Sequence, residues 1–296
     1  MIMKEKTIYA LGFFDGVHLG HQALLRACRE LADNHGCKAG AVTFGGHPEG
    51  LTRGKAPELI ATEEDRQKLL LAYGMDTVLM LPFDEKLMRT HWSAFLEQLV
   101  ESGAAGFVCG SDFRFGAGGG GTAKKLEGFC AARNLPCAIV PQQHLDGVRV
   151  SSTYIRQLLE QGDLAKANRF LGHNYFLSGP VVKGKHLGST IGVPTANLLL
   201  PEGLITPKFG VYATAATVDG KLYRAVTNIG TRPTVNGEGV TVEAHLLDFE
   251  GDLYGKSVTL SFYQFLRPEE KFNSLDELKA EIEKNALQSR KILEKL

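Results

Sequence analysis

The chain has 296 residues, of which 44% are hydrophobic, and its 33 lysines and arginines balance 33 aspartates and glutamates. This length exceeds that of most single domains and predicts two, while the balanced charge argues against a nucleic-acid partner. No apolar stretch approaches the roughly 18 residues of a membrane-spanning helix, and the N-terminus lacks the apolar core of a signal peptide, so we expect a cytoplasmic protein, away from membranes, that binds small molecules.

From residue 7 to about residue 150, short apolar runs alternate with helical patterns. This alternation indicates βαβ units, and hence an α/β domain with a parallel, Rossmann-like sheet and helices on both faces. We expect strands over residues 7–14, 38–44, 76–81, 106–110 and 136–140, and helices over residues 20–36, 62–74, 91–103 and 123–134.

The pattern changes after a helical stretch over residues 151–172. Short segments rich in β-branched and aromatic residues follow, separated by Gly, Pro or Asp turns, which is typical of antiparallel strands that close as a barrel or sandwich. We expect these strands over residues 175–182, 210–218, 221–229, 239–249 and 256–266.

The last expected element is a helix over residues 274–296. Ser274 is its N-cap and Glu277 completes a capping box, and we expect the leucines and isoleucines of the helix to pack on the barrel. The change in pattern predicts two domains, residues 1–172 and residues 173–296.

The stretch LGFFDGVHLGHQALL, residues 11–25, places His18 and His21 in a glycine-rich turn between the first strand and the first helix. In parallel sheets such a turn binds phosphates, because the N–H groups and dipole of the helix point at the carboxyl edge of the sheet. Two imidazoles would add donors for anionic oxygens. Two other interpretations stay open: ordinary polar turn residues, or a zinc site, for which only Cys28 lies close in sequence.

Two glycine-rich stretches match nucleotide-binding patterns only superficially. GAGGGG, residues 116–121, satisfies G-x-G-x-x-G, but a polar stretch separates it from its strand and no acid follows at the required distance. GPVVKGKH, residues 179–186, has His186 where Ser or Thr would bind magnesium. The sequence therefore predicts neither a Rossmann dinucleotide site nor a P-loop.

Nine motifs resemble one family, the bacterial bifunctional riboflavin kinase/FMN adenylyltransferases (FAD synthetases), in their order and spacing. The motifs similar to its adenylyltransferase half are GFFDGVHLGH (12–21), TFGGHP (43–48), GSDFRFG (110–116) and VSSTYIR (150–156). Those similar to its riboflavin kinase module are GSTIGVPTANL (188–198), GVYA (210–213), NIGTRPT (228–234), VEAHLLDFEGDLYGK (242–256) and FLRPEEKFNSLDELKAEI (265–282). The resemblance implies an α/β nucleotidyltransferase domain followed by an antiparallel β-barrel kinase domain with a C-terminal helix.

For the first domain, the resemblance implies adenylyl transfer, in which the FMN phosphate attacks the α-phosphorus of ATP and pyrophosphate leaves. His18 and His21 would hold the ATP phosphates and stabilise the transition state. Without the family, Ser152 and Thr153 read as helix N-caps and Asp112 as a turn acid. The residues that the resemblance further implies in nucleotide binding are Gly16, Gly20, His47, Asp112, Ser152, Thr153 and Arg156.

For the second domain, the resemblance implies phosphorylation of riboflavin by ATP, with Mg²⁺ as the cofactor. Thr195 and Asn197 would bind magnesium and its nucleotide, and Glu243 would be the general base. Gly184 and Gly188 would bracket a flap over the phosphates. Without the family, PTAN reads as a Pro-led turn and Glu243 as the polar member of an alternating strand.

The chain departs from the family pattern at two glycine-rich positions, Gly45 and Gly46 before His47 and the run at 118–121. Extra glycines raise the cost of ordering a loop. Two functions are therefore weighed: a bifunctional enzyme that makes FMN and then FAD, or a riboflavin kinase whose first domain is a weak or inactive nucleotide- or flavin-binding regulatory module. The substrates and products expected are riboflavin, ATP, FMN and FAD.

Overall fold

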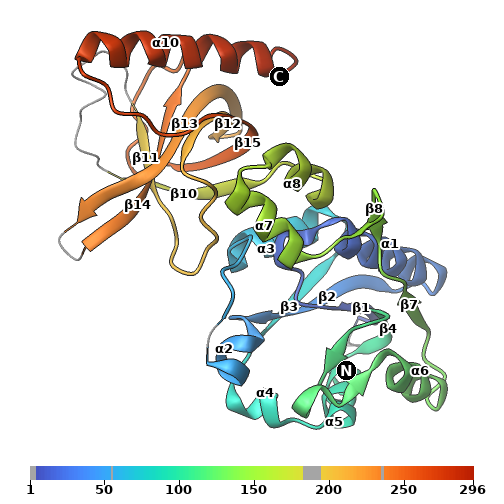
Figure 1. Ribbon diagram of the computed structural model, residues 1–296. Coiled ribbons are helices and arrows are strands. Elements are labelled where there is room, and N and C mark those ends of the chain that lie inside the picture. The colour runs from blue at the N-terminus through green and yellow to red at the C-terminus, as the bar shows by residue number, and fades with distance from the viewer. Residues whose placement is uncertain (1–4, 55, 183–194, 235–236) are drawn as a thin grey trace. The chain divides into compact units, whose positions relative to one another are not determined.

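The structure, a computed structural model, describes residues 5–54, 56–182, 195–234 and 237–296 (Figure 1). By its internal contacts the chain divides into two compact units, Met1–Ser152 and Thr153–Leu296. The sequence predicts a boundary between the two functional domains after residue 172. The division by contacts does not test that boundary, which stays a prediction. None of the described helices combines the length and apolarity needed to cross a membrane.

The first unit is built on a five-stranded parallel sheet in the order β3-β2-β1-β4-β7, which confirms the predicted parallel sheet. The chain adds strands on one side of β1 and then on the other, so the order reverses between β1 and β4. Ligands of such sheets bind at the carboxyl ends of the strands beside this reversal. The strands are β1 (Thr7–Leu11), β2 (Lys38–Gly45), β3 (Thr77–Pro82), β4 (Ala104–Gly110) and β7 (Cys137–Val140).

Helices cover both faces of this sheet. The buried side chains of α1 and α3 share one core cluster with Ile8 and Val108, while those of α5 and α6 share the other with Val42 and Phe107. Two short helices, α2 and α4, were not predicted. The helices are α1 (Leu19–Asn34), α2 (Pro48–Arg53), α3 (Glu63–Ala72), α4 (Glu85–Arg89), α5 (Trp92–Glu101) and α6 (Ala123–Ala131).

Strand β1 ends earlier than the sequence predicts, at Leu11 rather than at residue 14. Phe14 turns into the left-handed region with φ of 60° while its side chain stays buried, and a 3-10 turn, η1 (Asp15–Val17), follows. The buried Asp15 carboxylate accepts the Ile60 backbone N–H at 2.8 Å. These contacts fix the loop that leads into α1.

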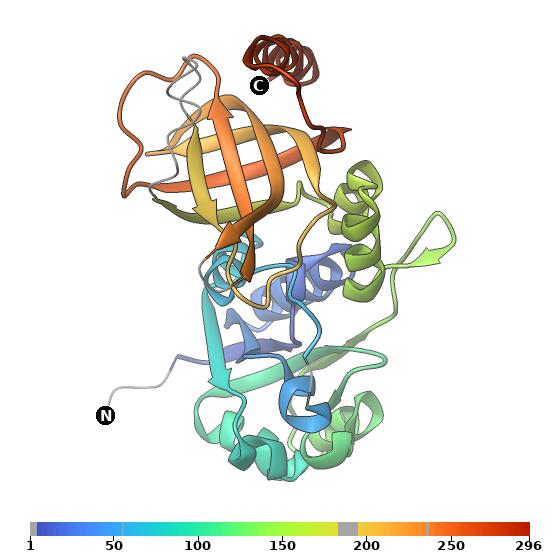
Figure 2. The ribbon, with the colours of Figure 1, turned by 60° about the vertical axis from the view of Figure 1, so that its left-hand side comes forward.

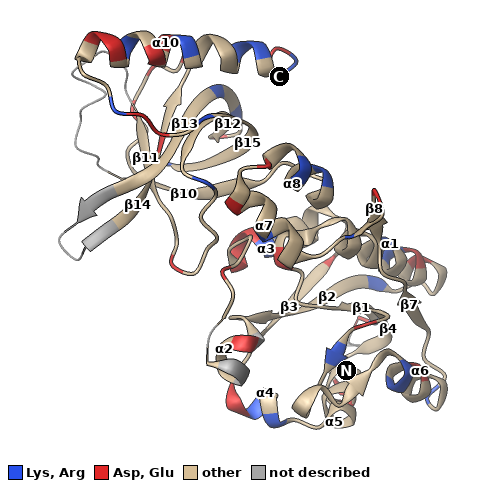
Figure 3. Ribbon diagram, in the orientation of Figure 1, with Lys and Arg blue, Asp and Glu red and all other residues tan. Residues whose placement is uncertain are grey.

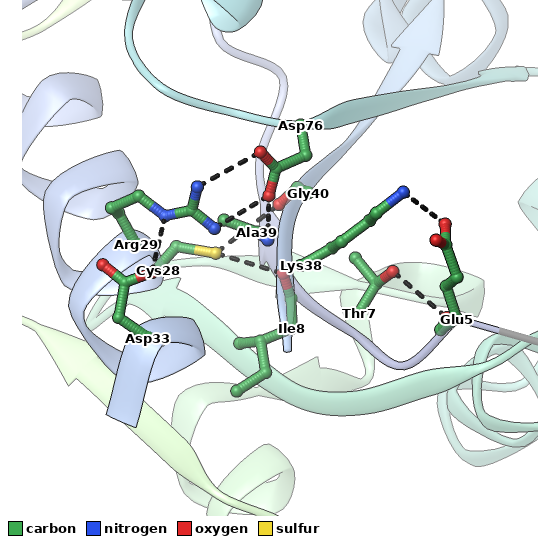
Figure 4. A network of polar contacts seen from close by, with 10 residues as sticks. All are labelled: Glu5, Thr7, Ile8, Cys28, Arg29, Asp33, Lys38, Ala39, Gly40 and Asp76. Carbon is green, nitrogen blue, oxygen red and sulfur yellow. Dashed lines mark hydrogen bonds and ion pairs between the residues drawn. The ribbon is translucent and has the colours of Figure 1, made fainter. Parts of the chain in front are cut away.

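A polar network joins the amino ends of the strands, at the edge opposite to the loop of η1 (Figure 4). The Asp76 carboxylate, just before β3, accepts two hydrogen bonds from Arg29 of α1, at 2.8 and 3.2 Å. It also accepts the backbone N–H of Ala39 in β2 at 2.8 Å. Because these bonds favour the charged carboxylate, the pKa of Asp76 is lowered from its ordinary value.

Replacing Asp76 with asparagine should lower the free energy of unfolding of the first unit by about 1 kcal/mol at neutral pH. The folded-state pKa lies below the unfolded value, so this contribution is present above about pH 4 and disappears as the pH falls through the folded pKa. Denaturant unfolding followed by the fluorescence of Trp92, the single tryptophan, measures it. Asp33→Asn is the matched control because Asp33 contacts the same arginine from the surface, at 3.4 Å. Equal losses from both variants at every pH would contradict the prediction.

The second unit begins with two helices where the sequence predicts one. α7 (Ser152–Gln161) ends before Gly162, which has φ of 82°, and Asp163 caps α8 (Leu164–Leu171) by accepting the Lys166 N–H. The Asn168 side chain of α8 donates to the Phe262 carbonyl at 2.9 Å and accepts the Tyr175 N–H at 2.7 Å. These bonds attach α8 to the strands that follow.

The strands of the second unit form a closed antiparallel barrel in the order β10-β11-β14-β13-β12-β15 (Figure 2). This resolves the predicted choice between barrel and sandwich. One strand was missed, β11, because PTAN reads locally as a turn. The strands are β10 (Phe176–Val182), β11 (Ala196–Leu199), β12 (Gly210–Val218), β13 (Lys221–Thr234), β14 (Gly237–Leu246) and β15 (Ser257–Arg267).

The C-terminal helix α10 (Leu275–Ile292) packs against β12 and β13, as predicted, and the Ser274 hydroxyl caps it by accepting the Glu277 N–H. The contact is more polar than expected. The Ser289 hydroxyl is buried and donates to the Ala225 carbonyl at 2.8 Å, whereas Leu287 is 69% exposed. Charges of both signs are interspersed along the helix (Figure 3).

Candidate active sites

The first unit has a cavity of about 320 Å³ at the carboxyl ends of β1, β4 and β7, beside the reversal in strand order. This is the edge at which the sequence placed an anion site. The cavity brings together five of the predicted site residues, although they come from three separate motifs. They are His18, Gly20, His21, Asp112 and Ser152.

His18 and His21 lie against each other at the first turn of α1. Their rings are stacked, with centroids 3.6 Å apart and planes inclined by 10°. His18 is the N-cap residue, and its Nδ1 accepts the backbone N–H of His21 at 3.3 Å. Because Nδ1 accepts, a neutral His18 carries its proton on Nε2, which is then a hydrogen-bond donor.

The imidazole of His21 is neutral at physiological pH. Its removal from water, followed by the charges of His18 and Arg66, holds the pKa of His21 well below the ordinary value of 6.5. Its Nδ1 is buried and has no hydrogen-bond partner among the residues that the structure describes. An unpaired buried nitrogen is costly, and the fold accepts this cost at a residue that also lines the cavity.

The rim of this cavity carries an ion pair that the sequence did not predict. Asp112 follows β4 and pairs with Arg149, which lies in a small hairpin of β8 (His144–Leu145) and β9 (Val148–Arg149). Asp112 lines the cavity with its charge balanced by Arg149, and its contact with ATP stays a prediction. The Ser152 hydroxyl, from the last residue of the first unit, donates to the Asp15 carbonyl of η1 at 3.1 Å.

A second cavity, of about 450 Å³, is lined mainly by aromatic and aliphatic side chains. It includes His47, so the structure places this predicted ATP-binding residue away from His18 and His21. The His47 ring meets Phe13 edge-on, with centroids 4.7 Å apart. The remaining aromatic side chains of this cavity are Phe44, Phe83, Phe95, Phe113 and Phe115.

The glycine run beside this cavity is a turn with a defined geometry. It connects β5 (Arg114–Phe115) and β6 (Gly121–Thr122). Gly116, Gly118 and Gly119 have φ of 70°, 60° and 65°, a region that favours glycine. Of the glycines at 118–121 that looked like departures from the family pattern, Gly118 and Gly119 thus have a backbone reason to be glycine.

The other predicted site residues of the first domain are placed less directly. Gly16 does not line the cavity; its φ is 70°, and a Cβ there would lie 2.8 Å from Ile60 Cγ2, so its glycine identity has a packing reason. Thr153 and Arg156 lie on α7 in the second compact unit. Contacts of these three residues with ATP stay predictions.

In the barrel, Asn197 and Glu243 lie side by side. Asn197 of β11 pairs in register with Glu243 of β14, which pairs on its other side with Asn228 of β13. We call Asn197, Glu243 and Asn228 the polar row. Their neighbours along each strand are buried while the three are partly exposed, so the row lies on the outer face of the barrel. Thr195 lies two residues before Asn197; Gly184 and Gly188 lie outside the described residues.

Sequence reasoning missed several polar residues at these sites. Asn228, whose amide donates to Glu269 at 3.1 Å, lies in a motif that carried the resemblance but had no role assigned. Arg66 is fully buried on α3 and donates to the carbonyls of Phe13 and Phe44. No spacing rule would have found Arg66, since its partners are backbone carbonyls of the loop after β1 and of strand β2, both distant in the sequence.

Comparison with known proteins agrees with this two-site arrangement. A family model for FAD synthetase matches residues 2–154, and one for riboflavin kinase matches residues 171–293. A bifunctional riboflavin kinase/FMN adenylyltransferase of Escherichia coli is 38% identical over 291 residues, which cover 97% of this chain and 93% of that protein. The chain belongs to the bifunctional riboflavin kinase/FMN adenylyltransferase family.

Other members of the bifunctional riboflavin kinase/FMN adenylyltransferase family match over nearly the same length. The protein of this name from Bacillus subtilis is 36% identical over 288 residues, covering 95% of this chain and 91% of that protein. A solved structure from Streptococcus pneumoniae, described as a macrolide-efflux protein, superposes with a TM-score of 0.87 at 29% identity and covers 97% of this chain and 94% of that one. The predicted family and fold are therefore confirmed.

Proposed function

We propose that the two reactions of the family are divided between the two sites described above, with adenylyl transfer at the histidine cavity and phosphorylation at the polar row. The chain is a bifunctional transferase: it phosphorylates riboflavin to FMN with ATP and adenylylates FMN to FAD with release of pyrophosphate. Both family domains are present, which supports this function rather than a kinase with a regulatory first domain. A cytoplasmic location stays a prediction.

The stacked pair of His18 and His21 is the observation that carries the first assignment. Two stacked imidazoles that line a cavity, at a helix N-terminus beside the reversal in strand order, fit a ligand that is rich in phosphate oxygens. Adenylyl transfer needs no covalent enzyme intermediate, so the site must position the reactants and stabilise the negative charge that grows on the phosphoryl oxygens. Neutral imidazoles can do this as hydrogen-bond donors.

The aromatic cavity is suited to the flavin ring of FMN. It adjoins the histidine cavity, since the two share Phe13, Phe113 and Arg114 in their linings. Flat aromatic ligands bind where rings and aliphatic side chains surround them. With the flavin there and ATP against the histidines, the FMN phosphate would reach the α-phosphorus of ATP.

The polar row supports the second assignment. Glu243 would accept the proton of the riboflavin hydroxyl as that oxygen attacks the γ-phosphorus of ATP. The Thr195 hydroxyl and Asn197 amide are hard oxygen donors of the type that suits Mg²⁺, which binds proteins through few ligands and keeps the phosphates of its nucleotide. When bound there, the ion would neutralise phosphate charge. Asn197 would hold it close to Glu243, its neighbour in the sheet register.

Removing Mg²⁺ should stop the first reaction of the sequence. The full-length chain, incubated with riboflavin and Mg-ATP, should form FMN and then FAD, as resolved by chromatography. Excess EDTA should abolish FMN formation, and added Mg²⁺ should restore it. FMN that accumulates without FAD would contradict the assignment of the first site, whereas FMN formation that persists in EDTA would contradict the magnesium assignment.

A further inference from the structure

The wall between the histidine cavity and the aromatic cavity contains a single charged side chain. Three residues line both cavities, and two of them, Phe13 and Phe113, are apolar. The third is Arg114, in β5 of the hairpin that β5 and β6 form. Ligands in the two cavities would therefore share Arg114 as a neighbour.

The guanidinium of Arg114 is exposed, and it forms no hydrogen bond or ion pair with any other residue in the described part of the chain. The other arginine of the histidine cavity differs, because Arg149 is paired with Asp112. Arg66 is likewise engaged, with the carbonyls of Phe13 and Phe44. Arg114 is thus a cation available to a ligand.

The hairpin leaves room for this side chain. Arg114 pairs with Thr122 across the hairpin, and the turn between them carries Gly119. A Cβ at Gly119 would lie 3.5 Å from Cδ of Arg114, which is an ordinary van der Waals contact. The left-handed φ of Gly119, 65°, is what disfavours other residues there.

We infer that Arg114 is a catalytic residue of adenylyl transfer, which contacts the FMN phosphate and the α-phosphate of ATP as they react. This inference rests on the proposed placement of ATP and FMN in the two cavities. In the reaction an oxygen of the FMN phosphate forms a bond to the α-phosphorus, the bond from that phosphorus to the β-phosphate oxygen breaks, and pyrophosphate leaves with the electron pair. Two anions must approach each other, and a planar guanidinium can donate to both.

Four variants of the full-length chain test the inference, with FAD formation from supplied FMN and riboflavin phosphorylation both measured. Arg114→Ala should lower kcat for FAD formation about a hundredfold and leave phosphorylation unchanged. Arg114→Lys should retain part of the rate, because lysine keeps the charge without the planar fork. Arg89→Ala, an exposed arginine of α4, is the matched control and should not change either activity. His21→Ala reports on the site itself.

Chemical rescue separates catalysis from structure. Millimolar guanidinium ion should restore Arg114→Ala about tenfold, a gain that a purely structural role would not give. Loss of FAD formation without rescue, loss of both activities together, or an active Arg114→Ala beside an inactive His21→Ala would each overturn the inference. If Arg114→Ala and His21→Ala both stay active, the proposed placement of ATP fails as well, so the two failures are distinguishable.

Discussion

Replacing His21 with alanine is expected to lower FAD formation from supplied FMN by about a hundredfold, the usual cost of removing one transition-state donor. The side chain lies at the first turn of α1, stacked on His18, and lines the cavity. Its removal takes away the buried nitrogen that has no protein partner and the ring that supports His18. Riboflavin phosphorylation by the same preparation should stay normal, because the polar row lies in the barrel.

His35→Ala is the matched control, since His35 lies exposed at the other end of α1. It should leave both activities unchanged. The pH profile gives a second check on His21. A pKa held well below 6.5 keeps this imidazole neutral at higher pH, so its protonation should not reduce FAD formation between about pH 8 and pH 6.5. Equal loss of both activities in His21→Ala would contradict the assignment, as would a loss of wild-type activity that titrates with His21 near pH 7.

Replacing Glu243 with glutamine should lower riboflavin phosphorylation by about a hundredfold to ten-thousandfold, the range for a lost general base. Glutamine keeps the size and hydrogen-bonding reach of the side chain between Asn197 and Asn228 but cannot accept the hydroxyl proton. FAD formation from supplied FMN should be unaffected. Rates with riboflavin and with FMN, measured on one preparation, show both results.

The control for this variant is Glu250→Gln, which changes an exposed carboxylate in the turn after β14. It should behave as wild type in both assays. Because glutamine has the same size as glutamate and its amide can occupy the place of the carboxylate, the substitution should not shift the melting temperature by more than a degree or two. An unchanged kinase rate in Glu243→Gln would refute the general-base role, and a rate that falls equally in both glutamine variants would indicate a loss of surface charge instead.

The parallel sheet was predictable because its strands and helices show as apolar runs that alternate with helical patterns along the sequence. The histidine turn was predictable because it follows the first strand. Local sequence patterns do not predict the conformation of a segment when contacts with residues distant in the sequence determine it. Phe14 reads as the end of a strand, yet its backbone is left-handed because the loop must reach Ile60, whose N–H binds Asp15. β11 reads as a turn, and pairing with β10 and β14 makes it a strand.

The sites show the same limit. The motifs predicted that His18, His21 and Asp112 lie at one edge of the sheet. The sequence did not predict which charged side chains pair with each other across the fold. Arg149 meets Asp112 from 37 positions further along the chain. His47 was grouped with the nucleotide because its motif accompanies the others; its ring meets Phe13 in the aromatic cavity, and its contact with ATP stays a prediction. Which motif residues share a cavity is decided by the loops between them, whose conformation depends on tertiary contacts.

In strand β14, residues that pack in the core alternate with residues on the outer face, where the proposed general base lies. Val242, Ala244 and Leu246 face the barrel interior, and Glu243 lies between them on the outside. Substitutions at the inner positions and at the outer position should therefore produce separable phenotypes, one in folding and the other in turnover. A residue inserted upstream of Val242 in this strand would impair folding and turnover together, because it would exchange the two faces of the strand and bury the carboxylate.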